Sequence, residues 1–536
     1  MEIFFNMCYY IMIYNVYLQK RGEQMISKVN SCAISGIDGY IVNVEVDMSN
    51  GIPSMDIVGL PDTAVKESKE RVKAAVKNCE FSYPQKKIIV NLAPAHTKKE
   101  GAYFDLPITA AILISSGQLI ADDIDDYVLI GELSLDGSLR SVNGVLPMAL
   151  AAKEHGVNNI IVPSDNAFEA AVADGLNVYG AKNLTEVVRH LSGEEKLNRV
   201  TVNLDEFFNE QIDYIDDFAD VKGQAAAKRA LEVAAAGGHN LIMIGAPGSG
   251  KTMLAKRLVS ILPSITFSEA LEVTKIYSIA GKLPPNTPIM KSRPFRSPHH
   301  TISPQAITGG GAVPKPGEIS LAHRGVLFLD EFPEFRKETI DSLRQPLEDG
   351  YFTVGRVAGS FTFPSETMLI ASMNPCKCGY YGDTSRKCTC LPGQIQKYLS
   401  KISGPMLDRF DIHVEVPTVK YSELESSEKS ESSAVIRERV NRARTIQLER
   451  YKNEKIFSNA SLSAASLDVY CPLDENCKTL LRNVFEKLGL SARAHSRIIK
   501  VARTIADLDA SENIKPNHIA EAIRYRSLDK KFWFNN

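Results

Sequence analysis

A glycine-rich segment that begins at Gly245 has the residue types and spacing of a phosphate-binding loop. It reads GAPGSGKT, which fits the Walker A pattern G-x-x-x-x-G-K-[ST]. Glycines let backbone N–H groups turn toward a phosphate, Lys251 is expected to reach the β- and γ-phosphates, and Thr252 to ligate Mg²⁺. The alternative is an ordinary glycine-rich turn. Binding of a nucleoside triphosphate is predicted for these residues: Gly245, Ala246, Pro247, Gly248, Ser249, Gly250, Lys251 and Thr252.

Two carboxylates and one amide are further candidates for phosphate chemistry. Asp330 and Glu331 end the apolar run GVLFLDE, the form of a Walker B strand. We expect Asp330 to hold Mg²⁺, directly or through water, and Glu331 to polarise the attacking water. Asn374 ends the run MLIASMN and is expected to orient that water or to touch the γ-phosphate. The alternative for Asn374 is the first position of a turn with Pro375.

These side chains need a particular scaffold to act together. The apolar run Leu241–Ile244 precedes the glycine loop, and a helix-like segment that begins at Met253 follows it. The runs before Asp330 and Asn374 are predicted as buried strands. In an open parallel sheet, ligands lie at the edge formed by the carboxyl ends of the strands. The sequence therefore predicts an α/β unit with a parallel sheet.

Two arginines are predicted to complete the site. The segment GPMLDRFDIH around Arg409 resembles the part of AAA+ ATPases that carries the arginine finger. The resemblance implies that Arg409 enters the site of a neighbouring subunit; the alternative is a structural Arg–Asp pair within one subunit. Ser491 is a predicted N-cap, and Arg493 in the first turn is expected to reach the γ-phosphate of its own subunit as sensor 2. Later basic residues of this helix, among them Arg503, are expected to be solvated.

A cysteine-rich segment follows Asn374 and reads CKCGYYGDTSRKCTC. Two cysteine pairs around a loop can present four thiolates to Zn²⁺, although the C-x-C spacing is tighter than the usual C-x-x-C. Free thiols or a redox-labile disulfide are the alternatives. His299 and His300 are further conceivable ligands, but nothing in the sequence places them near the cysteines. The candidate Zn²⁺ ligands are Cys376, Cys378, Cys388 and Cys390.

Composition sets limits on compartment and partners. The chain has 536 residues, enough for about three domains, and a net charge of −2. This charge excludes a global attraction to nucleic acid, so any DNA contact must come from local basic loops. The nine cysteines are few, and their clustering favours a reducing compartment, which predicts a cytoplasmic protein.

Residues 1–25 are apolar and aromatic but lack the basic segment and cleavage site of a signal peptide. We expect them to be an upstream extension of doubtful status, with a weak membrane anchor as the alternative. No other candidate span occurs in the sequence, and no membrane partner is predicted.

Residues 26–192 alternate between strand-like and helical runs. Strands are expected at 41–46 and 87–92, and helices at 62–76, 104–114 and 146–155, the first of them capped by Asp62. The unit resembles the ribosomal-S5-like domain shared with the proteolytic domain of Lon, through Gly131–Arg140, Asn143–Ala152 and Ile160–Pro163.

Active Lon-type domains need a serine nucleophile and a lysine base close together. Here the serine segment, which begins at Lys99, reads KEGAYFD, and the lysine segment offers Leu146 and Pro147. Both catalytic partners are therefore missing, and we expect an α+β scaffold without protease activity. Proteolysis remains the alternative.

Two insertions distinguish the ATPase segment. Arg293–Thr301 and the glycine- and proline-rich stretch up to Gly317 are predicted as a long loop, and residues 350–363 as a hairpin around Ala358–Ser360. Insertions at these places are typical of the helix-2-insert and pre-sensor-1 AAA+ group, which includes magnesium chelatase and the MCM helicases. The resemblance implies loops that line a pore and grip a nucleic-acid backbone, with Lys315 and Arg356 as candidate phosphate contacts.

The order of these motifs resembles the ComM/YifB group of magnesium chelatase-like AAA+ ATPases, over about residues 26 to 530. Shared signatures begin at Val58 (VGLPDTAVKES), Gly101 (GAYFDLP), Arg296 (RSPHH) and Asn374 (NPCKCG). The resemblance implies a hexameric, ATP-driven DNA motor that uses Mg²⁺ and acts on single-stranded or branched DNA. Such a branch-migration helicase promotes DNA integration in homologous recombination and natural transformation. The alternatives are a magnesium chelatase-type subunit or a protein-remodelling ATPase without a DNA role.

The resemblance also implies a domain plan. Asp220–Gln224 open the ATPase unit and resemble the AAA+ segment that packs on the nucleotide base, with a plain helix N-terminus as the alternative. The predicted layout is residues 1–25, the extension; 26–192, the S5-like domain; 193–217, a linker; 218–417, the AAA+ core with its insertions and cysteine loop; 418–435, a linker; and 436–536, a helical lid.

Overall fold

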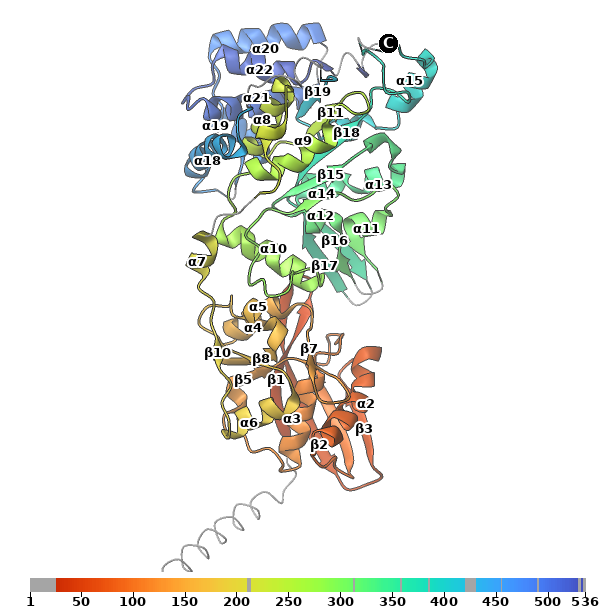
Figure 1. Cartoon of the computed structure of the whole chain (residues 1–536), viewed down its shortest axis with the longest axis vertical. Helices are drawn as coiled ribbons and strands as arrows, with labels where there is room; N and C mark the ends of the chain where they lie inside the picture. The colour runs from red at the N-terminus through yellow and green to blue at the C-terminus, as the bar shows by residue number, and fades with distance from the viewer. Residues whose placement is uncertain are drawn as a thin grey trace, which may run out of the picture. The chain divides into compact units, whose positions relative to one another are not determined.

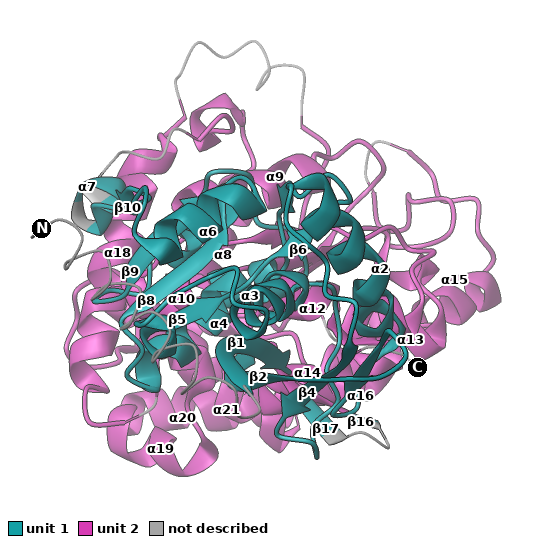
Figure 2. Cartoon of the chain, turned by 90° about the horizontal axis from the view of Figure 1, so that it is seen from below, with its two compact units in different colours: residues 1–210, 274–290, 355–361 teal, residues 211–273, 291–354, 362–536 magenta. Residues whose placement is uncertain are grey.

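The computed structural model divides the chain into two compact units (Figures 1 and 2). Unit 1 contains residues 1–210, 274–290 and 355–361, and unit 2 contains 211–273, 291–354 and 362–536. The structure describes residues 26–209, 214–311, 314–356, 359–383, 386–419, 430–454, 456–488, 491–528 and 532–533. The predicted extension 1–25 lies outside them. None of the described helices has the length and apolar character needed to cross a membrane.

Unit 1 is built on a mixed sheet with the strand order β10-β9-β8-β5-β1-β2-β4-β3. Its strands are β1 (Ser27–Ser35), β2 (Asp38–Ser49), β3 (Ser54–Val58), β4 (Lys87–Ala93), β5 (Tyr127–Leu129), β8 (Asn159–Pro163), β9 (Asn177–Ala181) and β10 (Arg199–Val200), and a separate pair is formed by β6 (Glu132–Leu133) and β7 (Leu139–Arg140). The long antiparallel pairs β1–β2 and β2–β4 lie in the half of the sheet that ends at β3.

The three helices predicted in unit 1, at 62–76, 104–114 and 146–155, are confirmed as α2, α3 and α4. Asp62 caps the first described helix, because its carboxylate accepts a hydrogen bond from the Val65 N–H at 2.8 Å. That helix buries Val65, Val72 and Val76 on one face, as its apolar spacing requires. The strands expected at 41–46 and 87–92 are also confirmed. The helices are α2 (Thr63–Asn78), α3 (Asp105–Ser115), α4 (Val145–Glu154), α5 (Ala167–Ala170), α6 (Leu184–Ser192) and α7 (Leu204–Asn209).

Unit 2 contains the predicted parallel sheet. All four neighbouring strand pairs in the order β12-β15-β18-β11-β19 are parallel. The strands are β11 (Leu241–Ile244), β12 (Phe295–Arg296), β15 (Val326–Leu329), β18 (Met368–Met373) and β19 (Ile412–Glu415). All strands of such a sheet end at the same edge, so the residues after β11, β15 and β18 become neighbours.

Both faces of this sheet are covered, as its continuous apolar strands require. Leu241, Met243 and Phe328 face a core that includes residues of α8 and of the C-terminal helices. Ile242, Leu327 and Leu329 face a second core. The C-terminal helices thus share a hydrophobic core with the strands that carry the phosphate-loop residues.

The described helices of unit 2 range from single turns to long helices, and the longest two, α18 and α21, follow β19. They are α8 (Ala225–Gly237), α9 (Lys251–Arg257), α10 (Phe267–Ile279, shared by both units), α11 (Pro304–Thr308), α12 (Glu318–Leu321), α13 (Lys337–Ser342), α14 (Arg344–Asp349), α15 (Pro392–Leu399), α16 (Gly404–Leu407), α18 (Ser433–Arg450), α19 (Ala464–Tyr470), α20 (Glu475–Leu488), α21 (Ala492–Leu508) and α22 (Pro516–Arg524).

The inserted segments differ partly from the sequence prediction. The stretch Arg293–Thr301, predicted as loop, contributes β12 to the parallel sheet, because Phe295 and Arg296 pair with Val326 and Leu327. Beyond it, β13 (Gly309–Gly310) pairs with β14 (Lys315–Pro316). The predicted hairpin is confirmed as β16 (Tyr351–Arg356) and β17 (Gly359–Pro364). The connector predicted at 193–217 contains β10 and α7.

Candidate nucleotide site

The phosphate-binding loop joins β11 to α9. Gly248 and Gly250 have φ angles of +77° and +91°, a left-handed conformation that glycine adopts without strain. The Nζ atom of Lys251 donates hydrogen bonds to the Gly245 and Ala246 carbonyl oxygens at 2.8 and 2.9 Å. Burial lowers the pKa of Lys251, while the charges of Asp330 and Glu331 oppose that shift. The loop therefore folds around a largely buried ammonium group. A bound phosphate would replace those carbonyl oxygens as the partner of this ammonium group.

Residues from three strand ends meet at this loop. The hydroxyl of Thr252 donates to Oδ2 of Asp330 at 2.6 Å, and Nζ of Lys251 donates to Oδ1 of Asn374 at 3.2 Å. Ser372, in β18, donates to the other oxygen of Asp330, and the Glu331 N–H donates to that oxygen at 3.0 Å. A hydroxyl and a carboxylate in contact are a suitable pair of oxygen ligands for Mg²⁺. The structure brings together Lys251, Thr252, Asp330 and Asn374; sequence reasoning missed Ser372.

Glu331 has an additional partner that sequence reasoning missed. Its backbone is left-handed, with φ +52° and ψ +45°, which is uncommon for a residue other than glycine and occurs often at functional sites. Nδ1 of His300 lies 3.6 Å from Oε2 of Glu331. The ring of His299 lies against that of His300, with centroids 4.1 Å apart. His300 is therefore placed beside the predicted water-polarising carboxylate.

Gln224 supports the loop from the side of α8. It also has a left-handed backbone, with φ +59°. Its Nε2 donates to the carbonyl oxygens of Pro417 at 2.6 Å and of Ser249 at 3.3 Å. Its Oε1 and the Ser249 hydroxyl are buried without a hydrogen-bond partner among the described residues. Two buried polar atoms beside the glycine loop fit a polar ligand such as a nucleotide.

Arg409 lies at the opposite end of the same strands, where they begin. It precedes β19, and its carbonyl oxygen accepts a hydrogen bond at 2.9 Å from Nδ2 of Asn240, the residue before β11. The guanidinium pairs with Glu348, from α14, and its Nε is buried without a partner among the described residues. Arg409 thus has an ion pair within its own subunit, as the alternative expected, but its partner is a glutamate and not an aspartate.

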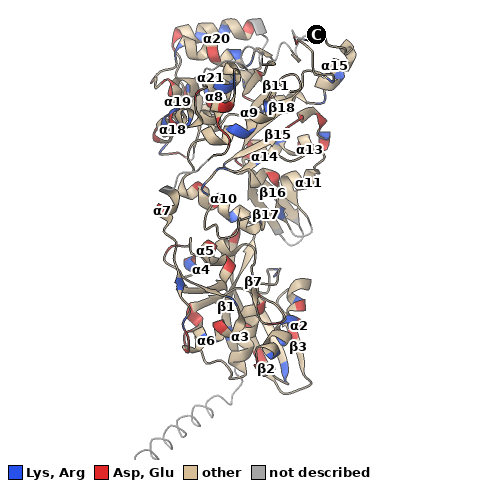
Figure 3. Cartoon of the chain, viewed as in Figure 1, with Lys and Arg blue, Asp and Glu red and all other residues tan. Residues whose placement is uncertain are grey.

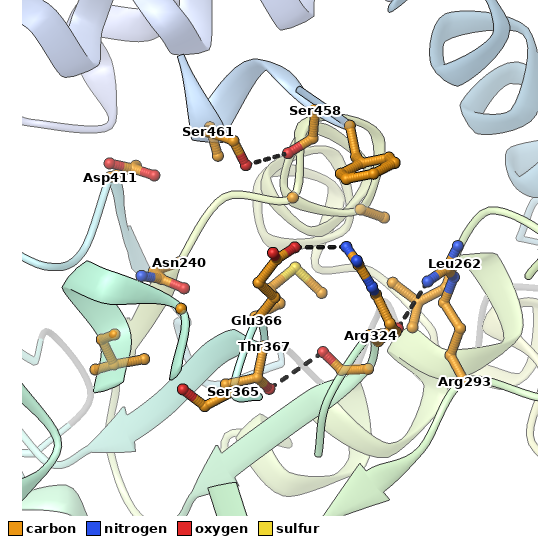
Figure 4. Close-up of a pocket in the computed structure, with 18 of the residues that line it drawn as sticks. Asn240, Leu262, Arg293, Arg324, Ser365, Glu366, Thr367, Asp411, Ser458 and Ser461 are labelled. Atoms are coloured by element: carbon orange, nitrogen blue, oxygen red, sulfur yellow. Dashed lines mark hydrogen bonds and ion pairs between the residues drawn. The ribbon is translucent and has the colours of Figure 1, made fainter. Parts of the chain in front are cut away.

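Arg409 lines a polar cavity of about 490 Å³ at this edge of the sheet (Figure 4). Asn240 and Asp411, which precede β11 and β19, line it together with Ser365, Glu366 and Thr367. Its lining carries charges of both signs: the cations Arg293, Arg324, Arg409, Arg444, Arg497 and Lys500, and the acids Glu269, Glu348, Asp349, Glu366 and Asp411. Several already have partners, since Arg324 pairs with Glu366, and Arg293 pairs with Glu269 at 2.8 Å. The charges in the cavity therefore largely compensate one another.

Arg493 lies with Arg409 rather than with the phosphate loop. Ser491 caps α21, as predicted. Nη1 of Arg493 is 3.6 Å from Oδ2 of Asp408, the residue before Arg409, and the side chain is 58% exposed. The expectation that Arg503 is solvated is wrong: it is 2% exposed and pairs with Asp507 at 3.0 Å. Because α21 packs in the core of unit 2, most of its circumference is buried.

The four cysteines also come together. The Sγ atoms of Cys376, Cys378, Cys388 and Cys390 all lie within 4.8 Å of one another. Cys376 is buried and the others are partly exposed. The histidines considered as further ligands lie elsewhere, because His300 contacts Glu331. The cluster could hold a metal ion.

Charged residues of both signs are interspersed over the chain (Figure 3), in keeping with the net charge of −2. Lys315, at the start of β14, is exposed. The side chain of Arg356 lies outside the described part of the chain. Lys315 thus places an exposed positive charge on the inserted pair β13–β14.

In the Lon-like segment of unit 1, Lys99 has a structural role. Nζ of Lys99 is buried and donates to the carbonyl oxygens of Pro94 and, at 2.8 Å, Thr97. Burial lowers the pKa of Lys99. Leu146 and Pro147 are buried in α4. The ammonium is held by carbonyls of its own loop, an arrangement that stabilises the turn.

Three family models match the chain. The model described as "Magnesium chelatase, subunit ChlI" matches residues 217–424. "Subunit ChlI of Mg-chelatase" matches residues 44–166, and "Magnesium chelatase, subunit ChlI C-terminal" matches residues 430–526. Together they extend over both units.

Several curated proteins are similar over nearly the whole chain. The "Competence protein ComM" of Haemophilus influenzae is 45% identical over 503 residues, which cover 93% of this chain and 97% of that protein. The "Uncharacterized protein YifB" of Escherichia coli is 43% identical over 506 residues, or 94% of this chain and 98% of that protein. The Lon protease of Finegoldia magna is 21% identical over 179 residues, which cover 31% and 23% of the two chains.

Proposed function

The chain belongs to the magnesium chelatase-like AAA+ ATPase family of ComM and YifB, and from this premise we propose that it is an ATP-driven hexameric DNA motor. Family membership implies ATPase activity with ATP and Mg²⁺. The proposed reaction is branch migration, by which a helicase promotes DNA integration in homologous recombination and natural transformation. The printed name of the H. influenzae relative, a competence protein, supports this assignment.

The observation that carries the ring proposal is the separation of two groups of predicted site residues. Lys251, Thr252 and Asp330 contact one another or Asn374 at the carboxyl edge of the sheet. Arg409 is tied to Asn240 at the other edge, before β11 begins. The four-residue strand β11 therefore separates the contact of Arg409 from the phosphate-loop residues. Arg409 is suited to the nucleotide of an adjacent subunit, which requires an oligomer with head-to-tail interfaces.

Each residue has a role in this proposal. Gly245–Thr252 bind the triphosphate, Thr252 and Asp330 hold Mg²⁺, and Glu331 polarises the attacking water. Asn374 orients that water from beside Lys251. Mg²⁺, when bound, neutralises charge on the phosphates. The residues present fit both groups, because the loop holds a buried ammonium and the Thr252 hydroxyl meets the Asp330 carboxylate.

Arg493 requires a revised role. We expected it to act on the nucleotide of its own subunit, but it pairs with Asp408, next to Arg409. Its position supports action on the same nucleotide as Arg409, that of the neighbouring subunit. The two arginines would then neutralise charge at the transferred phosphoryl group together.

DNA contact is assigned to the inserted hairpins. Lys315 is exposed on β14, where a phosphate of the DNA backbone can reach it. The S5-like unit serves as a scaffold without protease activity. We place the protein in the cytoplasm, where its DNA substrate lies.

The rate of ATP hydrolysis tests this function. Single-stranded and branched DNA should each raise the rate several-fold, and the stimulation should fall steeply as salt increases, because phosphate contacts release counterions. Glu331→Gln is the matched blank, since it keeps Lys251 and Thr252. Lys315→Ala should reduce stimulation by DNA. The same preparation should move a branch point in a four-strand junction.

An ATP hydrolysis rate that DNA does not change would contradict the proposal and favour a protein-remodelling ATPase. The family models named for magnesium chelatase favour a second candidate, a chelatase-type subunit. That function would require a large chelatase partner for activity, whereas the DNA motor should work alone.

A further inference from the structure

The four-cysteine loop has the geometry of a closed tetrathiolate metal site. The Sγ of Cys376 lies 3.3 Å from that of Cys378 and 3.7 Å from that of Cys388, and the latter two are 3.5 Å apart. Tetrahedral Zn²⁺ with Zn–S bonds of about 2.3 Å places thiolate sulfurs about 3.8 Å apart. Four soft ligands with no open position are typical of a structural Zn²⁺ site.

The loop joins a strand of the unit 2 sheet, β18, to helix α15. Cys376 follows β18 by three residues, and Cys390 lies two residues before α15 begins. Between them, the described residues form turns and irregular structure, without a helix or strand. A metal that joins the two cysteine pairs closes this loop and replaces the regular hydrogen bonding that it lacks.

The same loop contacts the phosphate-binding loop at two points. Gly379, directly after Cys378, packs on Pro247 so closely that a Cβ there would lie 2.7 Å from the proline Cγ. Gly379 also has φ +88°, a conformation that L-residues rarely adopt. Asn374, two residues before Cys376, accepts a hydrogen bond from Lys251 at 3.2 Å. Both contacts lie within three residues of a cysteine of the cluster.

We propose that Cys376, Cys378, Cys388 and Cys390 bind one Zn²⁺ that holds the phosphate-binding loop in its nucleotide-competent shape through Gly379 and Asn374. The ion has no part in the reaction itself. It fixes the turn that presses on Pro247 and the strand end that orients Lys251. The inference rests on nucleotide binding at this loop but on no role of DNA.

The physical basis is the cost of ordering the loop. Without the metal, four free thiols leave the segment between β18 and α15 as a long irregular connection, whose ordering is entropically unfavourable. Pro247 then loses its packing partner, and the phosphate loop must be ordered when the nucleotide binds. Ordering the loop then costs part of the binding free energy, so the measured affinity for the nucleotide is lower.

The first experiment measures metal content and nucleotide affinity on the full-length chain. Elemental analysis should find one zinc per chain in the wild type and none in the double variant Cys388→Ser/Cys390→Ser. The dissociation constant of a fluorescent ATP analogue should rise tenfold or more in that variant, and to a similar extent in wild type stripped by a chelator. Zinc added back to the stripped wild type should restore the affinity. Cys79→Ser, a cysteine of unit 1, is the matched control and should keep both the zinc and the affinity.

Gly379→Ala separates the contact from the metal. It leaves all four thiols in place but pushes a methyl group toward Pro247, so it should retain one zinc and bind the analogue several-fold more weakly. A chain without zinc would overturn the metal assignment. Zinc removal that leaves affinity unchanged, or a Gly379→Ala variant with wild-type affinity, would overturn the coupling to the phosphate loop. These readouts need no DNA, so a failure of the DNA-motor proposal leaves them interpretable.

Discussion

Nδ1 of His300 lies 3.6 Å from Oε2 of Glu331, so a histidine after β12 contacts the carboxylate that follows β15. The contact exists because β12 and β15 are parallel neighbours and end at the same edge of the sheet. Both side chains are partly exposed, at 33% and 59%, so neither is held by burial. We propose that His300 is a positioning residue for Glu331.

His300→Ala should lower kcat for ATP hydrolysis about tenfold with little change in KM, because Glu331 loses its partner while the phosphate loop stays intact. Steady-state kinetics on the full chain measure both constants. The control is His299→Ala, which removes the adjacent ring; it contacts Thr301 at 3.0 Å and should change kcat much less. Equal rates for the two variants would contradict the assignment.

Arg409→Ala should lower kcat by about 10³-fold or more, the effect expected when a finger arginine is lost. The position of Arg409 at the edge away from Lys251 predicts rescue between subunits. Mixed rings of Arg409→Ala and Glu331→Gln chains contain interfaces with an intact site on one side and an intact arginine on the other. Random mixing of equal parts should restore about a quarter of the wild-type rate. If the mixture stays as inactive as its components, Arg409 acts within its own subunit.

Arg71 pairs with a buried carboxylate of unit 1, that of Asp105. Nε of Arg71 donates to Oδ2 of Asp105 at 2.6 Å, and the carboxylate is fully buried. Arg71→Met leaves that carboxylate buried without its cationic partner, which should cost about 3–5 kcal/mol. Hydrogen exchange of α2 and α3 amides, followed by mass spectrometry, measures the loss. Arg140→Met is the control: its contact with Glu132 is 3.9 Å long and exposed, so its loss should cost under about 1 kcal/mol.

His190 makes the stability of unit 1 depend on pH. Nδ1 accepts a hydrogen bond from the Leu197 N–H at 2.9 Å, and burial lowers the pKa of His190 to about 4. The unfolded chain has a histidine pKa of about 6.5, so unfolding takes up a proton between these values. The contribution of His190 is complete above about pH 6.5 and declines, by up to about 1.4 kcal/mol per pH unit, as the pH falls toward 4.

Scanning calorimetry of the full chain at several pH values checks this dependence. His190→Gln should flatten the fall of the unit 1 transition between pH 6.5 and 4. His155→Gln, which removes an exposed histidine, should leave the fall as in wild type. An unchanged slope in the His190 variant would assign the pH dependence to other groups.

Local patterns were sufficient for the elements of the nucleotide site. The spacing of Gly245, Gly250 and Lys251 predicts a loop between strand and helix, and apolar runs that end in Asp330 and Asn374 predict strand ends. These features depend on neighbours in the chain, so sequence reasoning recovers them. Asp62 and Ser491 caps are local for the same reason, and both are confirmed.

Relationships between distant segments were decided by the tertiary structure. The contact of His300 with Glu331 depends on β12 pairing with β15, and two residues of strand leave almost no periodic pattern to detect. The burial of Arg503 depends on α21 lying inside a core, whereas its charge alone predicts solvent. The placement of Arg493 beside Asp408 and the packing of Gly379 on Pro247 likewise join residues far apart in the chain. The amino-acid sequence specifies which chemical groups the protein carries and where its local turns and caps form. Which of these groups meet is set by the packing of the sheet and helices, because such contacts follow from strand order and burial and not from spacing along the chain.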